Sequence, residues 1–308
     1  MTTRESALAG ARDAPFFEGF AERVVPVPEG EVFVRMNGEG PPLLLLHGYP
    51  QTSAMWHAVA PRLSEEYRVI CPDLRGYGRS SKPESAPDHA PYSKRAMGGD
   101  LFALMDALGH DRFLIGAHDR GARVAHRMAA DRPERVAALS VLDIAPTREM
   151  YAEGGSAFAA AYWHWYWLIL PAPWPETQIG QDRDAFWLFK CGDQGPGLAP
   201  FARPALAEYL DAFTPEAVAA SCEDYRAAWT IDRAHDDADP SKLPMPLLAL
   251  WGADGAIEAH FDCLALWRRR AERVEGRALP GGHYLAEQSP DALLAEWLPF
   301  FERHRGAA

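Results

Sequence analysis

The stretch Phe113–Arg123 constrains the fold of this chain more than any other segment. The apolar run Phe113–Ala117 is typical of a buried strand, and a helical pattern begins at Gly121, so few residues remain to connect them. Such a short connection needs a sharp turn, and small residues on either side relieve the crowding. The sequence therefore predicts a strand-to-helix elbow that presents the carboxylate of Asp119.

The rest of the chain repeats the alternation of strands and helices. Two short alternating runs, 23–27 and 31–36, predict an antiparallel hairpin. Continuous apolar runs predict strands that are buried on both faces. We expect these further strands at 42–46, 67–71, 136–142, 246–251 and 273–279, and helices over 92–108, 121–131, 260–270 and 291–305. This order predicts the α/β class, with a mostly parallel central sheet flanked by helices.

The alternation stops between about 146 and 240. This region is rich in Trp, Ala and Pro and shows helical spacing without a clear strand. We therefore expect a core domain formed by 1–146 and 241–308, and an inserted helical cap at 147–240. Ligand sites in open α/β sheets lie at the carboxyl ends of the strands, where such a cap would sit.

Composition excludes several classes of partner. The 308 residues carry a formal net charge of −12, which argues against binding to nucleic acid or to an anionic membrane. The four cysteines are widely spaced and form no C-x-x-C pair, so they predict neither a disulfide framework nor a zinc site. The N-terminal residues lack the apolar core of a signal peptide. We expect a cytoplasmic protein without metal or organic cofactor.

Arginines stand one and four residues after the aspartate of the elbow. A carboxylate nucleophile such as Asp119 forms an ester by displacing a leaving group from carbon. Arg120 and Arg123 are three residues apart, so they can share one face of the helix near that carboxylate. Two guanidinium groups here predict a substrate that carries its own negative charge. The simpler alternative is a solvated face paired with nearby acids.

Four motifs together resemble the α/β-hydrolase family over nearly the whole chain. They are His47-Gly48-Tyr49-Pro50, Asp73-Leu74-Arg75-Gly76-Tyr77-Gly78, the elbow at Asp119, and Gly281-Gly282-His283. The resemblance implies that His283 is the general base. It also implies an oxyanion-binding pair, formed by the backbone N–H groups of Tyr49 and Arg120. Without these motifs, Asp119 would read equally well as a helix N-cap.

Two residues compete for the role of the acid that orients His283. Asp143 ends the strand that follows the elbow, and Asp254 ends the next strand, which is the commoner family position. Either could instead cap a helix or a turn. The sequence 142–147 resembles the haloacetate dehalogenase branch of the family, in which the acid occupies the earlier position, and this favours Asp143.

The cap strengthens the resemblance to that branch. His164-Trp165 and Glu223-Asp224-Tyr225-Arg226 are similar to segments of fluoroacetate dehalogenases. The resemblance implies that His164, Trp165 and Tyr225 donate hydrogen bonds to the departing halide. It implies hydrolysis of fluoroacetate or another small anionic haloacid to glycolate, and it implies a homodimer.

Two other functions remain open. An epoxide hydrolase of the same fold shares the aspartate nucleophile and uses cap tyrosines, for which Tyr151, Tyr162, Tyr166 and Tyr225 are candidates. Epoxide hydrolases commonly have Trp after the nucleophile, whereas this chain has Arg120. A non-catalytic binder of this fold often lacks a member of the triad, and all three residue types are present here.

Overall fold

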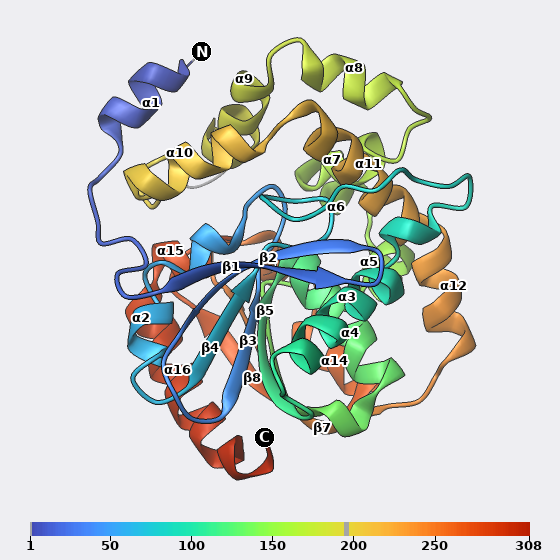
Figure 1. Ribbon diagram of the computed structural model, residues 1–308. Helices are drawn as coiled ribbons and strands as arrows, with labels where there is room; N and C mark the ends of the chain where they lie inside the picture. Colours follow the sequence, from blue (N-terminus) through green and yellow to red (C-terminus); the bar gives the residue numbers. More distant parts are fainter. Residues whose placement is uncertain (1, 194–196) are drawn as a thin grey trace.

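A computed structural model describes residues 2–193 and 197–308 (Figure 1). Within these ranges, eight strands form one sheet in the order β1-β2-β4-β3-β5-β6-β7-β8. The strands are β1 (Ala21–Val27), β2 (Gly30–Asn37), β3 (Pro42–Leu46), β4 (Arg68–Pro72), β5 (Phe113–His118), β6 (Val136–Leu142), β7 (Leu243–Gly252) and β8 (Ala271–Leu279). The predicted α/β class, with a mostly parallel sheet, is confirmed.

The direction of the strands follows the sequence pattern. β1 and β2 pair antiparallel with Val25 opposite Val32, and β2 pairs antiparallel with β4. From β4 to β8 neighbouring strands are parallel, as in the register of Leu44 with Ile115. Every residue of β3, β5 and β6 is buried, which explains their uninterrupted apolar character.

Helices cover both faces of the sheet. Figure 1 shows α2 (Ala60–Leu63) and α16 (Pro290–His304) on one side, and α3 (Lys94–Ala107), α4 (Asp119–Asp131) and α14 (Cys263–Arg270) on the other. The expected helix over 260–270 is two helices, since α13 (Ala256–His260) ends before Asp262. The side chain of Asp262 caps α14 by accepting a hydrogen bond from Ala265 N.

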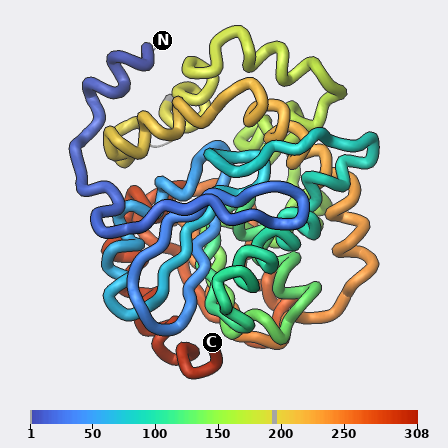
Figure 2. The backbone as a smooth tube through the Cα atoms, viewed as in Figure 1, coloured from blue at the N-terminus to red at the C-terminus, as the bar shows by residue number. Residues whose placement is uncertain are grey.

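Helices also form the region between β6 and β7. They are α5 (Thr147–Glu153), α6 (Ser156–Ala161), α7 (Trp163–Trp167), α8 (Trp174–Gly180), α9 (Arg183–Leu188), α10 (Arg203–Ala212), α11 (Pro215–Trp229) and α12 (Ile231–Ala238). In Figures 1 and 2, α7 to α11 lie across one end of the sheet. We call residues 147–240 the cap. The short helix α1 (Arg4–Gly10) lies beside α10. Just after α1, Arg12 O accepts a hydrogen bond of 2.7 Å from Arg203 N, at the start of α10.

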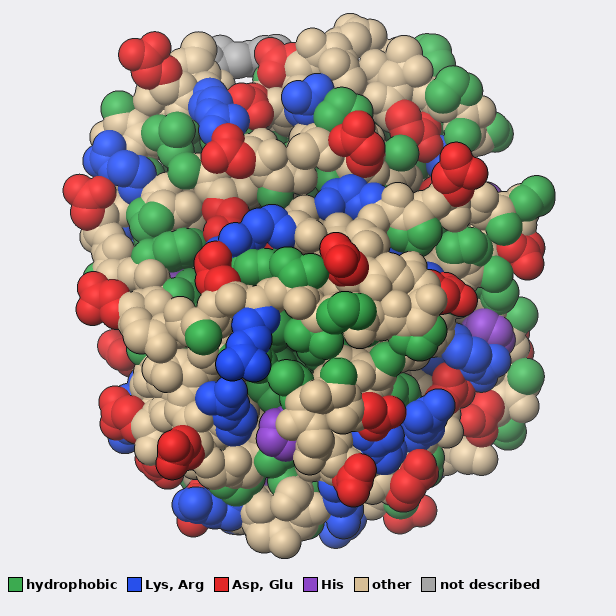
Figure 3. Space-filling model, in the orientation of Figure 1, with side chains coloured by type: hydrophobic (Ala, Val, Ile, Leu, Met, Phe, Trp, Pro, Cys, Tyr) green, Lys and Arg blue, Asp and Glu red, His purple; other side chains and the backbone are tan. Residues whose placement is uncertain are grey.

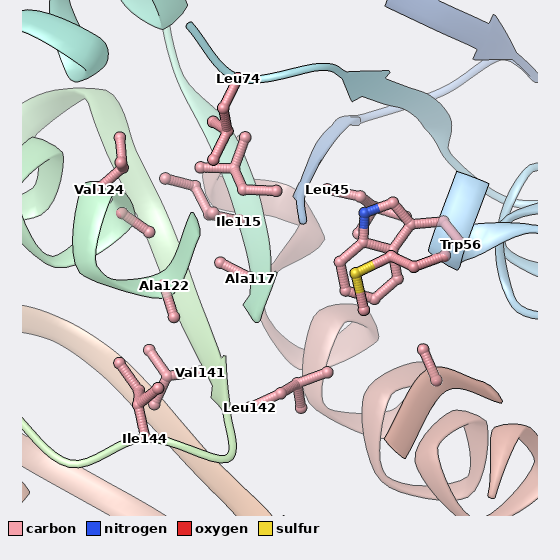
Figure 4. Packing of buried hydrophobic residues seen from close by; sticks show 14 of the residues in the cluster. Leu45, Trp56, Leu74, Ile115, Ala117, Ala122, Val124, Val141, Leu142 and Ile144 are labelled. Atoms are coloured by element: carbon pink, nitrogen blue, oxygen red, sulfur yellow. The ribbon is translucent and has the colours of Figure 1, made fainter. Parts of the chain in front are cut away.

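Core side chains pack the elbow against the sheet. Figure 4 shows Ile115 and Ala117 of β5 among side chains of α4 and β6, such as Val124 and Val141. Behind β6, Trp297 of α16 is fully buried and donates its indole N–H to Ser140 Oγ at 2.7 Å. The elbow therefore rests on a closely packed layer, which fixes its position.

The surface carries both signs of charge. On the face drawn in Figure 3, acidic and basic side chains are interspersed rather than separated by sign. All four cysteines are buried free thiols. None of the described helices combines the length and the apolar character that crossing a bilayer requires.

Candidate active site

The elbow has the geometry that its sequence predicts. Asp119 follows β5 directly and adopts φ 44°, a left-handed conformation that costs about 1–3 kcal/mol for a residue with a side chain. Gly121 N donates to His47 O at 2.9 Å, and a Cβ on Gly121 would lie 2.4 Å from that oxygen. A Cβ on Gly48 would lie 2.6 Å from the Asp119 Cβ. A side chain at position 48 or 121 would therefore collide with its surroundings, so both positions require glycine.

The imidazole of His283 lies between two carboxylates. Its Nδ1 is 2.6 Å from Asp143 Oδ2, and its Nε2 is 4.0 Å from Asp119 Oδ2. Asp143 Oδ1 also accepts a hydrogen bond from Gly252 N at 3.0 Å, which fixes the carboxylate at the end of β6. Asp254 is exposed and lies on the wall of the cavity. The structure thus brings Asp143 to His283, in the arrangement of nucleophile, base and acid.

Asp119 is ionised in this environment. Burial opposes its ionisation, but the charges of His283, His118, Arg123 and Arg120 together lower the pKa of Asp119 to about 2. An ionised carboxylate is the form that can attack carbon.

The turn after β3 contacts the nucleophile. Tyr49 N donates to Asp119 Oδ1 at 3.0 Å. One of the two predicted oxyanion donors therefore contacts the Asp119 carboxylate. The other predicted donor, Arg120 N, belongs to the first turn of α4. The preceding residue, His118, lies against the base, with its Nε2 2.8 Å from His283 O.

Arg123 is a buried cation without a carboxylate within hydrogen-bonding distance in the described chain. Its side chain is 3% exposed, and Nη1 donates to Thr147 Oγ1 at 2.8 Å and to Ala145 O at 3.2 Å. Its Nε meets no acceptor among the described residues. Burial lowers the pKa of Arg123, while the nearby charge of Asp119 favours the charged form. A small anion beside Asp119 would satisfy this group.

Arg120 has a partner that the sequence did not reveal. It is fully buried, and its Nε and Nη2 donate to Asp224 of α11 at 2.9 and 2.5 Å. Tyr77 and Lys94 also donate to this carboxylate. Arg120 Nη1 is the guanidinium nitrogen that meets no acceptor in the described chain. The two predicted clamp residues therefore differ, since Arg120 is ion-paired and Arg123 is not.

The three predicted halide donors form one buried cluster. The ring of Tyr225 lies 5.8 Å from that of His164 and 6.5 Å from that of Trp165. His164 Nδ1, Trp165 Nε1 and Tyr225 OH have no hydrogen-bond partner among the described residues. The guanidinium of Arg123 lies 4.5 Å from the Trp165 ring and that of Arg120 lies 4.1 Å from the Tyr225 ring. The two predicted clamp arginines thus pack against two of the predicted halide donors.

A cavity of about 610 Å³ leads to the nucleophile. Asp119, His283, Tyr49 and His164 contribute to its wall, whereas Arg120, Arg123, Trp165 and Tyr225 lie outside that lining and are buried. The wall also includes Lys190 of the cap, which had no place in the sequence analysis, and Tyr162, a predicted candidate for an epoxide hydrolase, whose hydroxyl lies 3.5 Å from His283 Nδ1. In the described ranges, no three His, Cys, Asp or Glu side chains gather in a way that could hold a metal ion.

Comparison with known proteins places the chain in a family. Residues 41–290 match the model of the alpha/beta hydrolase fold. The chain belongs to this family, as the four motifs predicted.

Its relatives include enzymes of two kinds. The fluoroacetate dehalogenase of Burkholderia sp. is 46% identical over 280 residues, which cover 89% of this chain and 91% of that protein. A soluble epoxide hydrolase of Corynebacterium sp. (strain C12) is 31% identical over 274 residues, covering 86% and 91%. A solved structure of an α/β hydrolase from Nostoc sp. PCC 7120 is 46% identical, covers 93% of this chain and 98% of its own, and superposes with a TM-score of 0.89. The predicted resemblance to the dehalogenase branch agrees with the first of these.

Proposed function

We propose that this protein hydrolyses carbon–halide bonds, and that its substrates are fluoroacetate and related haloacetates. The observation that carries the proposal is Arg123, a buried cation that has no ion-pair partner among the described residues and whose charge acts on the ionised Asp119. A nucleophilic carboxylate repels an anionic substrate unless a cation lies beside it. The 46% identity to a fluoroacetate dehalogenase supports the same substrate class.

In the first step, one Asp119 oxygen attacks the halogen-bearing carbon of the substrate. The new carbon–oxygen bond forms as the carbon–halogen bond breaks, and its electron pair leaves with the halide. Arg120 and Arg123 hold the substrate carboxylate. His164, Trp165 and Tyr225 donate hydrogen bonds to the leaving halide, and each has a donor atom without a protein partner in the described chain.

In the second step, water hydrolyses the ester on Asp119. His283 takes a proton from the water, and the hydroxide adds to the carboxyl carbon of Asp119. The N–H groups of Tyr49 and Arg120 stabilise the oxyanion that forms. Asp143 balances the positive charge on the imidazole. The intermediate collapses by breaking the bond between the Asp119 carboxyl carbon and the glycolyl oxygen, which takes the proton from His283 and leaves as glycolate. The Asp119 carboxyl group then loses its proton to water and is again the carboxylate.

Epoxide hydrolysis is the second candidate. It is favoured by Tyr162, which lies on the cavity wall close to His283, and by the buried, unpaired hydroxyl of Tyr225. Two tyrosine hydroxyls near Asp119 could donate to an epoxide oxygen. This chemistry has no use for a buried cation at Arg123, so we place it second.

One assay separates the two candidates. Halide release is measured with fluoroacetate and chloroacetate, beside diol formation from styrene oxide. We expect halide release from both acids, and its loss in Asp119→Asn. Clear diol formation without halide release would replace the first function by the second. We also propose a homodimer, as the resemblance implies, and a cytoplasmic location, as expected from the N-terminal sequence. Sedimentation and cell fractionation test these two proposals.

A further inference from the structure

A buried carboxyl group outside the candidate triad joins three parts of the active site. Glu287 lies in α15 (Leu285–Gln288), four residues after His283, and is 3% exposed. Its Oε1 accepts a hydrogen bond from Tyr209 OH at 3.0 Å, and its Oε2 lies 2.6 Å from the Gln51 side-chain amide. No Lys, Arg or His of the described chain lies within ion-pair distance of this carboxyl. A negative charge here would be buried without a partner.

The geometry favours the neutral acid. A protonated carboxyl needs an acceptor for its proton, and the Gln51 side chain can supply one. Turning the Gln51 amide over would place its oxygen, which has no other partner in the described chain, against a carboxyl proton. Burial raises the pKa of Glu287 to about 8, although its bonds with Gln51 and Tyr209 and the charge of Arg12 oppose this shift. Glu287 therefore holds a proton at pH 7.

Each partner of Glu287 leads to a different part of the site. Gln51 belongs to the turn after β3, two residues beyond Tyr49, whose N–H contacts the nucleophile. Tyr209 belongs to α10 of the cap, and its ring stacks at 5.5 Å on Trp187, which donates to Pro50 O at 3.0 Å. The Glu287 carboxyl thus connects the turn after β3, the segment that carries His283, and the cap.

We propose that neutral Glu287 is a positioning residue that holds the Tyr49 turn and the cap in register with His283, and that its ionisation loosens this junction and lowers turnover at alkaline pH. The effect on turnover rests on the proposed function, whereas the junction itself does not. Glu287 touches neither the nucleophile nor the base, so it acts through Gln51 and the backbone.

Other groups that face Glu287 do not titrate in the same range. Tyr209 of α10 has a pKa well above 10, because it is buried beside Glu287. Cys191, in the turn Phe189–Asp193, has its pKa raised by burial to about 11. Arg12, in the N-terminal segment, donates to Pro200 O. Among these groups, Glu287 is the first to lose a proton above pH 7.

The first test is the pH dependence of kcat/KM for chloroacetate in wild type, Glu287→Gln and Glu287→Ala. Glutamine keeps the shape and cannot ionise. We expect wild-type kcat/KM to fall about tenfold between pH 7 and 9, as a group with a pKa near 8 loses its proton. In Glu287→Gln the decline should move upward by at least one pH unit, whereas Glu287→Ala should be about tenfold slower at every pH. Exposed Glu39→Gln is the matched control and should keep the wild-type profile. Identical profiles for wild type and Glu287→Gln would overturn the proposal.

The second test needs no substrate. Hydrogen exchange of the turn 48–52 and of α10 is measured at pH 7 and 9 and corrected for the intrinsic rate. We expect weaker protection at pH 9 in the wild type and no change in Glu287→Gln. Unchanged wild-type protection would refute the junction. If no haloacetate is turned over, the proposed function fails, yet this exchange measurement still decides the role of Glu287.

Discussion

Replacing Arg123 with methionine removes the buried cation and keeps most of its volume. In the wild type, this guanidinium bonds to Ala145 O and Thr147 Oγ1, and its Nε is left for a ligand. A hydrogen bond between charged groups contributes about 1.5–3 kcal/mol. Since 1.36 kcal/mol is a factor of ten, kcat/KM for chloroacetate should fall about 10- to 150-fold.

The same substitution also leaves Ala145 O and Thr147 without their donor. That structural loss affects every substrate equally, so the informative measurement is a ratio. Chloroacetamide has the same carbon–chlorine bond and nearly the same size, but it carries no charge. We expect Arg123→Met to lower kcat/KM for chloroacetate at least tenfold more than kcat/KM for chloroacetamide.

Arg127 supplies the matched control on the next turn of α4. It pairs with Asp131 at 3.4 Å and lies near Asp236 and Asp239, away from the cavity wall. Arg127→Met should leave the ratio of the two substrates unchanged. An equal fall for chloroacetate and chloroacetamide in Arg123→Met would refute the assignment of Arg123 to the substrate carboxylate.

Four further substitutions test other groups of the site. Asp143→Asn should abolish hydrolysis of the ester while Asp254→Asn does not, as followed by mass spectrometry of the alkylated enzyme; the reverse result would exchange the two residues. Tyr225→Phe should slow fluoride release about tenfold, and chloride release less, because fluoride is the stronger hydrogen-bond acceptor; equal effects in a halide assay would remove Tyr225 from the halide site. The pKa of Asp119 is lower in the folded protein than its value of 3.8 in the unfolded chain, so ionised Asp119 stabilises the fold above pH 3.8. This stabilisation is lost as the pH falls towards 2. Between pH 5 and 3, the free energy of unfolding from denaturant titrations should therefore fall by about 1 kcal/mol more in the wild type than in Asp119→Asn. Equal decreases in the two proteins would contradict the lowered pKa of Asp119.

The placement of the three candidate triad residues at one edge of the sheet could be predicted, because it follows from chain order in a parallel sheet. Asp119, Asp143 and His283 each follow a strand directly or by a short loop, and the carboxyl ends of parallel strands meet at one edge. Local sequence even indicates the elbow, since Gly48 and Gly121 leave no room for a side chain. Chain order alone left Asp143 and Asp254 open, because they follow two neighbouring strands. The resemblance at 142–147 favoured Asp143, and the structure places Asp143 beside His283.

The electrostatic partners could not be predicted in this way. Asp224 lies 104 residues from Arg120 and 130 residues from Lys94, on a cap helix whose packing against the core has no local sequence pattern. The sequence places Asp224 next to Tyr225 but gives no reason to assign it to Arg120. Likewise, Glu287 reads as an ordinary polar residue of a short helix, and its burial depends on side chains of α10 and the turn after β3.

In the proposed reaction, these partners give the two arginines different roles in substrate binding. A carboxylate brought within about 4 Å of the ionised Asp119 is repelled by about 4 kcal/mol at an effective dielectric constant of 20. Arg120 shares its charge with Asp224, so it compensates this repulsion only in part, but Asp224 and the Tyr225 ring hold its free Nη1 in a fixed direction. Arg123 has no such acidic partner in the part of the chain that the structure describes, so its charge is available to offset the repulsion. In the proposed reaction, Arg123 therefore makes an anionic substrate tolerable beside Asp119, and Arg120 fixes how that substrate lies.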